Sequence, residues 1–381
     1  MHKNDMQNFE SIRPYKDTEV PKAVKRLTSN IFFPWLVNTL APDENLKAVT
    51  DKIKEIKTVK EFQEKVSFAV IRRIIDQSIT KFTCEGWEQR DKNKPYLFVS
   101  NHRDIVLDAA LLNYYFFLID IPQTEITFGS NLMKNEISVD IGKLNRMFPI
   151  SRSGNLRDLY RDYMVVSSYI RHVINEKKRS VWIAQRSGRT KDGNDKTEPA
   201  VLKMFAMSND DNFVENISEL SITPVSVSYE YESCAFAKAA EIYVSSLTKY
   251  KKSKYEDYYS IFNGVKAQKG NVNFVITPTI TKEELEYCDS FEKTEKFVQL
   301  AKIIDKRIYD AYTLYKNNYI AYDILYKGNK FADQYDSNDK KIFLDYLANG
   351  INDLDIPNKS DIERILLDMY ANPVKNKFSL K

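Results

Sequence analysis

The sequence predicts an α/β fold with helical extensions at both ends. Between about Thr83 and Thr281, short runs of β-branched and aromatic residues alternate with amphipathic stretches, and this order is typical of α/β domains. On either side of this region, apolar residues recur at spacings of three and four, which predicts helices. With 381 residues, 43% of them hydrophobic, the chain can bury at least one large core. We therefore expect an N-terminal helical extension at 1–82, an α/β domain at 83–281 and a C-terminal helical extension at 282–381, packed as one unit.

The expected elements follow in chain order. The first helical stripe comprises Phe62, Val66, Ala69, Val70, Ile74 and Phe82. Seven runs then have the composition of strands: Tyr96–Ser100, Glu125–Gly129, Met147–Ser151, Ser180–Ala184, Leu220–Tyr229, Glu241–Ser246 and Asn273–Thr277. From Thr281 onward the helical face comprises Phe297, Leu300, Ala301, Ile304, Ile308, Ala311, Tyr312 and Tyr315.

Composition limits the classes of function. The net charge of +4 is too small to indicate a nucleic-acid partner. Cys84, Cys234 and Cys288 are far apart and lack metal-type spacing, so we expect free thiols in a reducing cytoplasm. The N-terminal segment has no apolar core, and the longest apolar stretch, Ala109–Ile119, is well short of the ~20 residues that cross a bilayer. We expect a cytoplasmic protein whose membrane contact is peripheral.

A histidine follows the first predicted strand directly. Asn101, His102 and Asp104 come after Tyr96–Ser100, and Asp108 opens the next apolar run. Histidine is the side chain whose unperturbed pKa suits a general base near neutral pH. An aspartate that accepts its second ring N–H would hold the tautomer and stabilise the imidazolium. His102 is therefore the candidate base, with Asp108 or Asp104 as its partner.

Polar and basic residues also follow three later strands. Arg152 follows Met147–Ser151, and Arg186, Ser187, Gly188, Arg189 and Lys191 follow Ser180–Ala184. The last of these strands, Leu220–Tyr229, carries Pro224. Ligands of α/β sheets bind outside the carboxyl ends of the strands, and guanidinium groups bind phosphate oxygens in pairs. The arginines therefore predict a site for a phosphorylated ligand near His102.

The order of these four blocks resembles the glycerolipid acyltransferase superfamily, the glycerol-3-phosphate and 1-acylglycerol-3-phosphate acyltransferases. The matching blocks are Asn101-His102, Phe148-Pro149-Ile150-Ser151-Arg152, Gly188 with Arg186 and Arg189, and Ile222-Thr223-Pro224-Val225. The resemblance spans roughly Tyr96 to Glu230, and the residues beside His102 and after Pro224 look more like its glycerol-3-phosphate branch. It implies a mixed, largely parallel sheet flanked by helices.

The sequence departs from the family pattern at two positions. The family aspartate lies five positions after the histidine, where this chain has Leu107, and Asp108 comes one residue later. One residue turns a helical side chain through ~100°, so the loop must absorb the shift if Asp108 is the partner; otherwise Asp104 takes the role. In the third block, Ser187 stands where the family has its glutamate, which leaves the acceptor less defined than the reaction.

The resemblance implies transfer of a fatty acyl group to a hydroxyl, without a covalent acyl-enzyme. His102 would deprotonate the acceptor and Asp108 would orient His102. Arg103, Arg152, Arg186, Ser187, Gly188 and Arg189 would bind substrate, and backbone N–H groups near a helix start would stabilise the oxyanion. The donor would be acyl-CoA or an acyl carrier protein. The acceptor would be glycerol-3-phosphate, a lysophospholipid or a hydroxylated acylamino-acid lipid, in phospholipid synthesis at the cytoplasmic face of a membrane. No cofactor and no metal are expected.

Other interpretations start from the same residues. A metal-dependent hydrolase could use His102, Asp104 and Asp108, although further ligands are scarce. A non-catalytic lipid-binding protein would bind lipid without His102. Two segments could meet a membrane: Ile31–Val37, whose aromatic residues favour an interface or the core, and the lysine- and tyrosine-rich run Lys249–Tyr255, which could also be a solvated loop or bind RNA or an acyl carrier protein.

Overall fold

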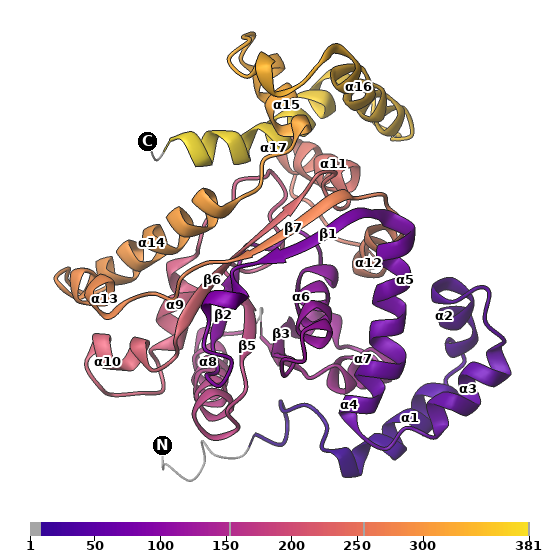
Figure 1. Ribbon diagram of the computed structural model, residues 1–381, viewed down its shortest axis with the longest axis vertical. Helices are drawn as coiled ribbons and strands as arrows, with labels where there is room; N and C mark the ends of the chain where they lie inside the picture. The colour runs from indigo at the N-terminus through magenta and orange to yellow at the C-terminus, as the bar shows by residue number, and fades with distance from the viewer. Residues whose placement is uncertain (1–8, 152–153, 254–255, 380–381) are drawn as a thin grey trace.

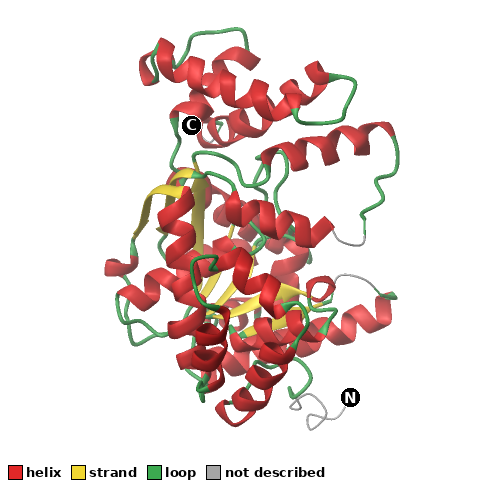
Figure 2. Ribbon diagram, turned by 90° about the vertical axis from the view of Figure 1, so that its right-hand side faces the viewer, coloured by secondary structure: helices red, strands yellow, loops and turns green. Residues whose placement is uncertain are grey.

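A seven-stranded mixed sheet forms the centre of the protein (Figures 1 and 2). The structure is a computed structural model that describes residues 9–151, 154–253 and 256–379. The strand order is β1-β7-β6-β2-β5-β3-β4. The strands are β1 (Ile79–Glu85), β2 (Leu97–Ser100), β3 (Glu125–Gly129), β4 (Met147–Ile150), β5 (Val181–Ala184), β6 (Ile222–Tyr229) and β7 (Gly270–Ile276).

Five neighbouring strands, β6, β2, β5, β3 and β4, are parallel, and β7 joins β6 antiparallel. The carboxyl ends of these five strands therefore lie at one edge of the sheet. That edge receives the loops after β2, β4 and β5, which carry the residues predicted to bind substrate. The expected mixed, largely parallel sheet is confirmed.

Side chains alternate between two cores along the central strands. In β2, Leu97 and Val99 belong to one apolar cluster and Phe98 to the other. In β5, Val181 and Ile183 face the first cluster and Trp182 the second. Because successive strand residues point to opposite faces, continuous burial of β2 and β6 means that helices cover both faces.

Helices pack on both faces of the sheet. One face carries α8 (Leu156–Arg171), α9 (Pro199–Phe205), α10 (Phe213–Ser218), α13 (Lys282–Asp289) and α14 (Glu295–Ala311). The other carries α5 (Phe68–Ser78) and α6 (Leu107–Leu118). A π-helical turn, Gln63–Ser67, joins α4 (Val59–Phe62) to α5, and another, His172–Glu176, extends α8.

Two further groups of helices complete the molecule. The N-terminal group comprises α1 (Val20–Ser29), α2 (Phe33–Leu40) and α3 (Leu46–Lys54), and α1 contacts α7 (Glu136–Leu144). In the C-terminal group, α15 (Lys316–Leu325), α16 (Ser337–Asn352) and α17 (Lys359–Phe378) share a core with α11 (Ala235–Leu247) at the top of Figure 1. The short helix α12 (Glu256–Lys266) packs against α5.

Two predicted elements are wrong. Phe82 lies in β1, not in a helix. Within the described residues β1 pairs with β7 alone, almost 200 residues later, so the residues near β1 in the sequence do not indicate that it forms a strand. The run Glu241–Ser246 is part of α11, not a strand. Its composition is strand-like, but Ala235 and Ala239, four residues apart, are buried in the core shared with α17, and this packing outweighs local propensity.

Candidate active site

His102 and Asp108 form a buried hydrogen-bonded pair just beyond β2. The ring Nδ1 of His102 lies 2.8 Å from Asp108 Oδ2, and the Asp108 carboxylate is fully buried. Asp108 lies in the first turn of α6, whose positive N-terminal end favours a carboxylate. Because Asp108 occupies Nδ1, Nε2 is the ring nitrogen left for the pocket that His102 lines.

The loop between β2 and α6 absorbs the extra residue. Asp108 Oδ2 accepts the backbone N–H groups of Arg103 at 2.6 Å and Asp104 at 3.0 Å, which folds the loop back over the start of the helix. Asp104 instead accepts the N–H groups of Val106 and Leu107 and the Ser233 hydroxyl. Burial raises the pKa of Asp104, but these hydrogen bonds outweigh it and hold the pKa below its usual value. Of the two candidates, Asp108 contacts His102 and Asp104 caps α6.

Tyr229, at the end of β6, is a partner of this pair that the sequence analysis missed. Its hydroxyl donates to Asp108 Oδ1 at 2.9 Å. Burial and the neighbouring Asp108 charge raise the pKa of Tyr229 well above its usual value, so the phenol stays neutral and donates. Asp108 therefore accepts four hydrogen bonds, and its orientation toward His102 is over-determined. The register that joins β6 to β2 places Tyr229 there, and no local pattern indicates it.

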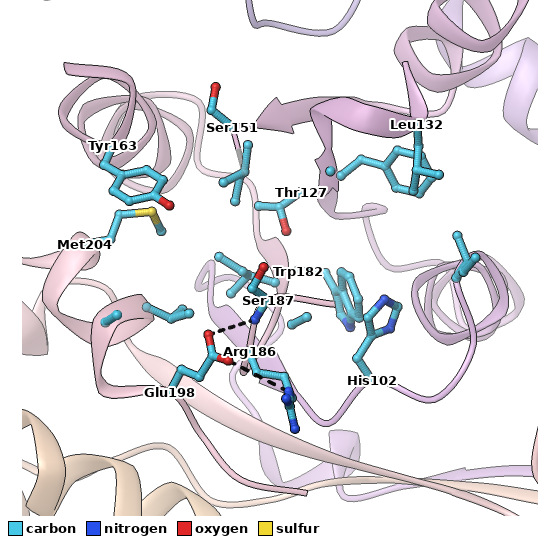
Figure 3. A pocket seen from close by; sticks show the side chains of 18 residues that line it. His102, Thr127, Leu132, Ser151, Tyr163, Trp182, Arg186, Ser187, Glu198 and Met204 are labelled. Carbon is cyan, nitrogen blue, oxygen red and sulfur yellow. Dashed lines mark hydrogen bonds and ion pairs between the residues drawn. The ribbon is translucent and has the colours of Figure 1, made fainter. Parts of the chain in front are cut away.

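An apolar pocket of about 120 Å³ opens beside His102 (Figure 3). His102 and Trp182 lie on one side of this pocket, and Tyr163 and Met204 lie on the opposite side. The Trp182 ring meets His102 edge to face, with ring centroids 5.6 Å apart. The lining is mostly aliphatic and aromatic, which suits a hydrocarbon chain.

A second pocket of about 430 Å³ also has His102 in its wall and is mainly polar. Four of the predicted substrate-binding residues, Arg186, Ser187, Gly188 and Arg189, line this pocket. The loop turns at Gly188, where a φ of 82° favours glycine. Arg186 Nε and Arg189 Nη1 are buried nitrogen atoms without a hydrogen-bond partner among the described residues. Unsatisfied guanidinium donors beside a pocket are suited to anionic oxygens.

Glu198, which the sequence analysis missed, places a carboxylate next to Ser187, the residue that stands where the family has its glutamate. Its Oε2 accepts the Ser187 backbone N–H at 3.0 Å, and its Oε1 lies 3.9 Å from Arg186 Nε (Figure 3). The Glu198 N–H also donates to Gln185 O at 2.9 Å. This backbone bond closes residues 186–197 into a compact loop, here called the basic loop. The loop closure, which the sequence does not reveal, carries Glu198 back to the strand end.

Arg103, expected to bind substrate, is buried outside both pockets. Its side chain is 1% exposed and lines neither pocket. The guanidinium pairs with Asp195 at 2.6 Å and with Glu232 at 2.9 Å. It points away from the His102 ring because this buried pairing compensates for its desolvation. Arg152, also expected to bind substrate, lies outside the described residues.

The amide groups at the start of α6 are not free to stabilise an oxyanion. The N–H groups of Arg103 and Asp104 donate to Asp108, and those of Val106 and Leu107 donate to Asp104. These four amides are therefore poor candidates for stabilising the oxyanion. Each would have to give up a hydrogen bond to a buried carboxylate first.

The same hydrogen bonds disfavour a metal site at His102, Asp104 and Asp108. Oxygens that accept N–H and O–H donors would have to lose them to ligate a cation. Across residues 9–151, 154–253 and 256–379, no group of three or more His, Cys, Asp or Glu side chains is arranged to hold a metal ion. Cys84, Cys234 and Cys288 are free thiols.

The comparison with protein families agrees with the ordered blocks. Residues 81–229 match the family model described as Acyltransferase. Among solved structures, the chain is similar to the crystal structure of the 1-acyl-sn-glycerophosphate (LPA) acyltransferase PlsC from Thermotoga maritima. That similarity has 14% sequence identity and a TM-score of 0.39, and covers 74% of this chain and 91% of that chain. No curated protein matches the chain significantly.

Proposed function

We propose that residues 81–229, which match the acyltransferase family model, form an acyltransferase domain of the glycerolipid type, and that the enzyme acylates a phosphorylated lipid precursor. The acceptor is a glycerol-3-phosphate-type molecule or a lysophospholipid, and the donor is a fatty acyl thioester of CoA or acyl carrier protein. The reaction belongs to phospholipid synthesis.

The observation that supports this most is the place of His102 between two unlike pockets. It lines both the apolar pocket and the polar pocket. A transferase needs one base within reach of both an acyl chain and a hydroxyl-bearing acceptor. A hydrolase, by contrast, needs no second pocket with cations beside the base.

In the proposed reaction, His102 Nε2 takes the proton of the acceptor hydroxyl as its oxygen attacks the thioester carbonyl. Asp108 holds the tautomer and stabilises the imidazolium. The tetrahedral intermediate then collapses, the C–S bond breaks, and the thiolate leaves with the proton from His102. The products are an ester and a free thiol.

The basic loop supports a phosphorylated acceptor. Arg189 presents a buried Nη1 without a hydrogen-bond partner among the described residues, and Arg186 Nε makes no hydrogen bond there but only a 3.9 Å ion pair with Glu198. By contrast, Lys191 pairs with Glu241 and Lys252 pairs with Asp257 around the same pocket. We therefore assign acceptor phosphate binding to Arg186 and Arg189, with Glu198 beside Arg186.

A peripheral membrane contact is proposed through α2 and the residues before it. Ile31, Phe32 and Trp35 are exposed, whereas Phe33 and Val37 are buried in the N-terminal core. One side of the segment therefore packs against the N-terminal core while the other exposes apolar side chains to solvent, as in a helix that lies in a membrane interface. Trp35 contacts Phe262 of α12 with ring centroids 4.5 Å apart, and Asp257 at the start of α12 lines the polar pocket. Lipid held by this surface would thus lie near the pocket mouth. No helix within the described residues is long and apolar enough to span a bilayer.

Thiol release from a long-chain acyl-CoA and from an acylated carrier protein tests the proposed reaction. A panel of glycerol-3-phosphate, lysophosphatidic acid and a hydroxylated acylamino-acid lipid is offered to the wild type and to His102→Ala. We expect acceptor-dependent release that falls by about 10³-fold or more in the folded variant, because general-base catalysis contributes about 10²- to 10⁴-fold and the intermediate's breakdown also uses His102. Lipid binding without thiol release from any pair would instead indicate a non-catalytic lipid-binding protein.

Sedimentation with anionic vesicles tests the membrane contact. The double variant Ile31→Ser and Phe32→Ser should bind vesicles at least tenfold more weakly with an unchanged melting temperature, because both side chains are exposed. Ile342→Ser on α16, also exposed, is the matched control and should bind like the wild type. Equal binding by the double variant and the control would contradict this assignment.

A further inference from the structure

Asp195 is a buried carboxylate that connects the two loops of the candidate site. It lies in the basic loop and is 2% exposed. Its Oδ2 accepts Arg103 Nη2 at 2.6 Å and Asn101 Nδ2 at 3.0 Å, both from the loop that carries His102. Its Oδ1 accepts the Thr190 hydroxyl at 2.6 Å from within the basic loop.

A backbone hydrogen bond runs parallel to these contacts. The Thr190 N–H donates to the carbonyl oxygen of His102 at 2.8 Å. Asp195 therefore holds the residues on both sides of His102 and the threonine that bonds to His102 itself. The position of Arg189, next to Thr190, depends on the same connection.

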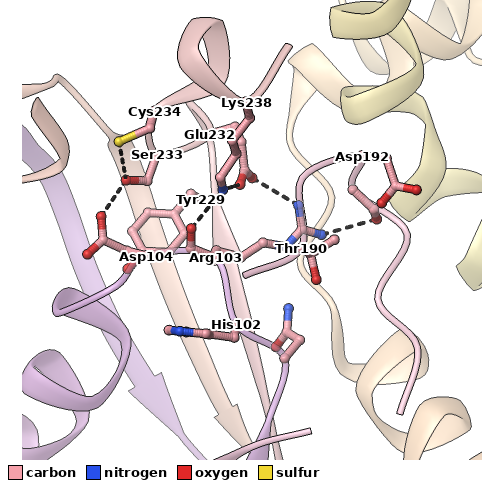
Figure 4. A network of polar contacts seen from close by, with 12 residues as sticks. His102, Arg103, Asp104, Thr190, Asp192, Tyr229, Glu232, Ser233, Cys234 and Lys238 are labelled. Atoms are coloured by element: carbon pink, nitrogen blue, oxygen red, sulfur yellow. Dashed lines mark hydrogen bonds and ion pairs between the residues drawn. The ribbon is translucent and has the colours of Figure 1, made fainter. Parts of the chain in front are cut away.

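The loop that carries His102 is held from its other side by an ion-pair network (Figure 4). Glu232 pairs with Arg103 and with Lys238, and Lys238 Nζ also donates to the Arg103 carbonyl at 2.7 Å. In Figure 4, the Arg103 side chain extends away from His102 toward Glu232. With this side held independently, loss of Asp195 should release the basic loop while His102 stays in place.

The C-terminal helices hold the outer side of the basic loop. The Tyr309 hydroxyl donates to the Asp195 carbonyl, and Asp305 accepts the Thr197 N–H at 2.8 Å. Asn372 Nδ2 donates to the Asp192 carbonyl at 2.7 Å. These contacts limit the loop's outward movement. Its spacing from His102 is set by the side chain of Asp195 together with two weaker connections, the Thr190 N–H bond to the His102 carbonyl and the 3.3 Å bond from Arg103 Nη2 to the Gly193 carbonyl.

We infer that Asp195 is a positioning residue that sets the spacing between the His102 base and the arginines of the basic loop. The inference rests on the proposed function, since it assigns the acceptor to the basic loop. Without Asp195, the acceptor phosphate is still attracted to the arginines, but its hydroxyl no longer lies in line with His102 and the thioester. The apolar pocket, formed largely by other elements, should keep the acyl chain in place.

The experiment compares acceptor-dependent transfer with acceptor-independent thioester hydrolysis in the same preparations. For Asp195→Ala we expect kcat/KM for the acceptor to fall about 10²-fold, the loss that a displacement of about 1 Å can cause. Hydrolysis and the KM for the donor should change less than threefold. Asp195→Asn can still accept hydrogen bonds from Arg103 and Asn101 through its oxygen and donate one to Thr190 through its nitrogen. Its kcat/KM for the acceptor should therefore be at least tenfold higher than that of Asp195→Ala.

Asp140→Asn is the matched control. Asp140 is 1% exposed and pairs with Arg26 and Tyr15, away from both pockets. It should lower the melting temperature without changing the ratio of transfer to hydrolysis. If Asp195→Ala lowers transfer and hydrolysis in equal proportion, or leaves transfer unchanged, the inference is overturned.

Amide hydrogen exchange provides a readout that does not depend on activity. Asp195→Ala should speed amide exchange across residues 186–197, and the rate at the Thr190 amide should rise at least tenfold. Asp140→Asn should leave these rates unchanged. Unchanged protection at Thr190 would overturn the inference even if no acceptor were found. A wild type that releases no thiol, or releases it independently of His102, would contradict the proposed function separately.

Discussion

The two edges of the His102 ring lie in opposite environments. On the Nδ1 side, Asp108 is fully buried and accepts four hydrogen bonds, from His102, Arg103, Asp104 and Tyr229. On the pocket side, Arg186 and Arg189 keep buried nitrogen atoms without hydrogen-bond partners among the described residues, although Arg186 Nε makes a 3.9 Å ion pair with Glu198. Saturated hydrogen bonding fixes one orientation of the base, whereas unsatisfied donors leave interaction energy for a ligand. The protein therefore keeps one edge rigid and leaves the other to the substrate.

The largest expected effect comes from the rigid edge. Asp108→Asn places an amide where the His102 ring N–H needs an acceptor, and the wrong tautomer or orientation results. We expect kcat to fall about 10³- to 10⁴-fold with little change in KM. Steady-state kinetics with the acceptor and donor varied in turn measure this loss. Tyr229→Phe, which removes one of the four hydrogen bonds, is the graded comparison and should cost about tenfold or less. Full activity of Asp108→Asn would remove the distinction between the two edges.

Asp305 is a partly buried carboxylate that accepts hydrogen bonds only from Thr197 among the described residues, whereas Asp108 accepts four. Burial raises its pKa to about 6, although the hydroxyl and N–H of Thr197 oppose the shift. Because the folded pKa exceeds the unfolded value of 3.8, Asp305 favours folding fully below pH 3.8, and this contribution disappears as pH rises to about 6. Asp305→Asn should therefore raise the free energy of unfolding, relative to wild type, by about 2 kcal/mol at pH 8. Denaturant unfolding at several pH values measures the difference, which should shrink between pH 6 and pH 4. A pH-independent difference would contradict the assignment to Asp305.

Substitutions on the pocket side of His102 should change KM. Arg189→Gln keeps a polar side chain but removes the charge, so we expect the KM for a phosphorylated acceptor to rise about 10- to 100-fold. The KM for the donor should stay within twofold. Arg161→Gln on α8, an exposed arginine that lines neither pocket, is the control. Equal KM values for Arg189→Gln and the control would show that the acceptor phosphate lies elsewhere.

The smallest expected effect concerns the apolar pocket. Met204 is buried on the side opposite His102, and Met204→Phe should shorten the space for an acyl chain by about two methylene groups. At about 0.8 kcal/mol per buried methylene, the preference for a donor two carbons shorter should increase about tenfold. Competition between donors of different chain length measures this ratio. An unchanged chain-length profile would place the acyl chain in another part of the protein.

Local patterns were sufficient for the parts of this protein that depend on neighbouring residues. Five predicted strands, at 96–100, 125–129, 147–151, 180–184 and 220–229, coincide with β2 to β6 within two residues at either end. Three of them, β2, β5 and β6, lie in the interior of the sheet and are almost wholly buried, which explains their continuous apolar composition. The position of His102 after a strand, and of Arg186 and Arg189 after another, followed from the same patterns.

Long-range contacts decided what the sequence did not reveal. β1 is an edge strand defined by its pairing with β7, and α11 is helical because its alanines pack against α17. The choice of Asp108 over Asp104 depended on a loop that folds back over α6. Closure of the basic loop brings Glu198 to the site, and the register of β6 brings Tyr229 there. The Arg103 side chain instead pairs with two buried carboxylates outside the pockets. A chain can specify which residue follows a strand locally, but which side chains meet depends on how distant strands and loops pack together.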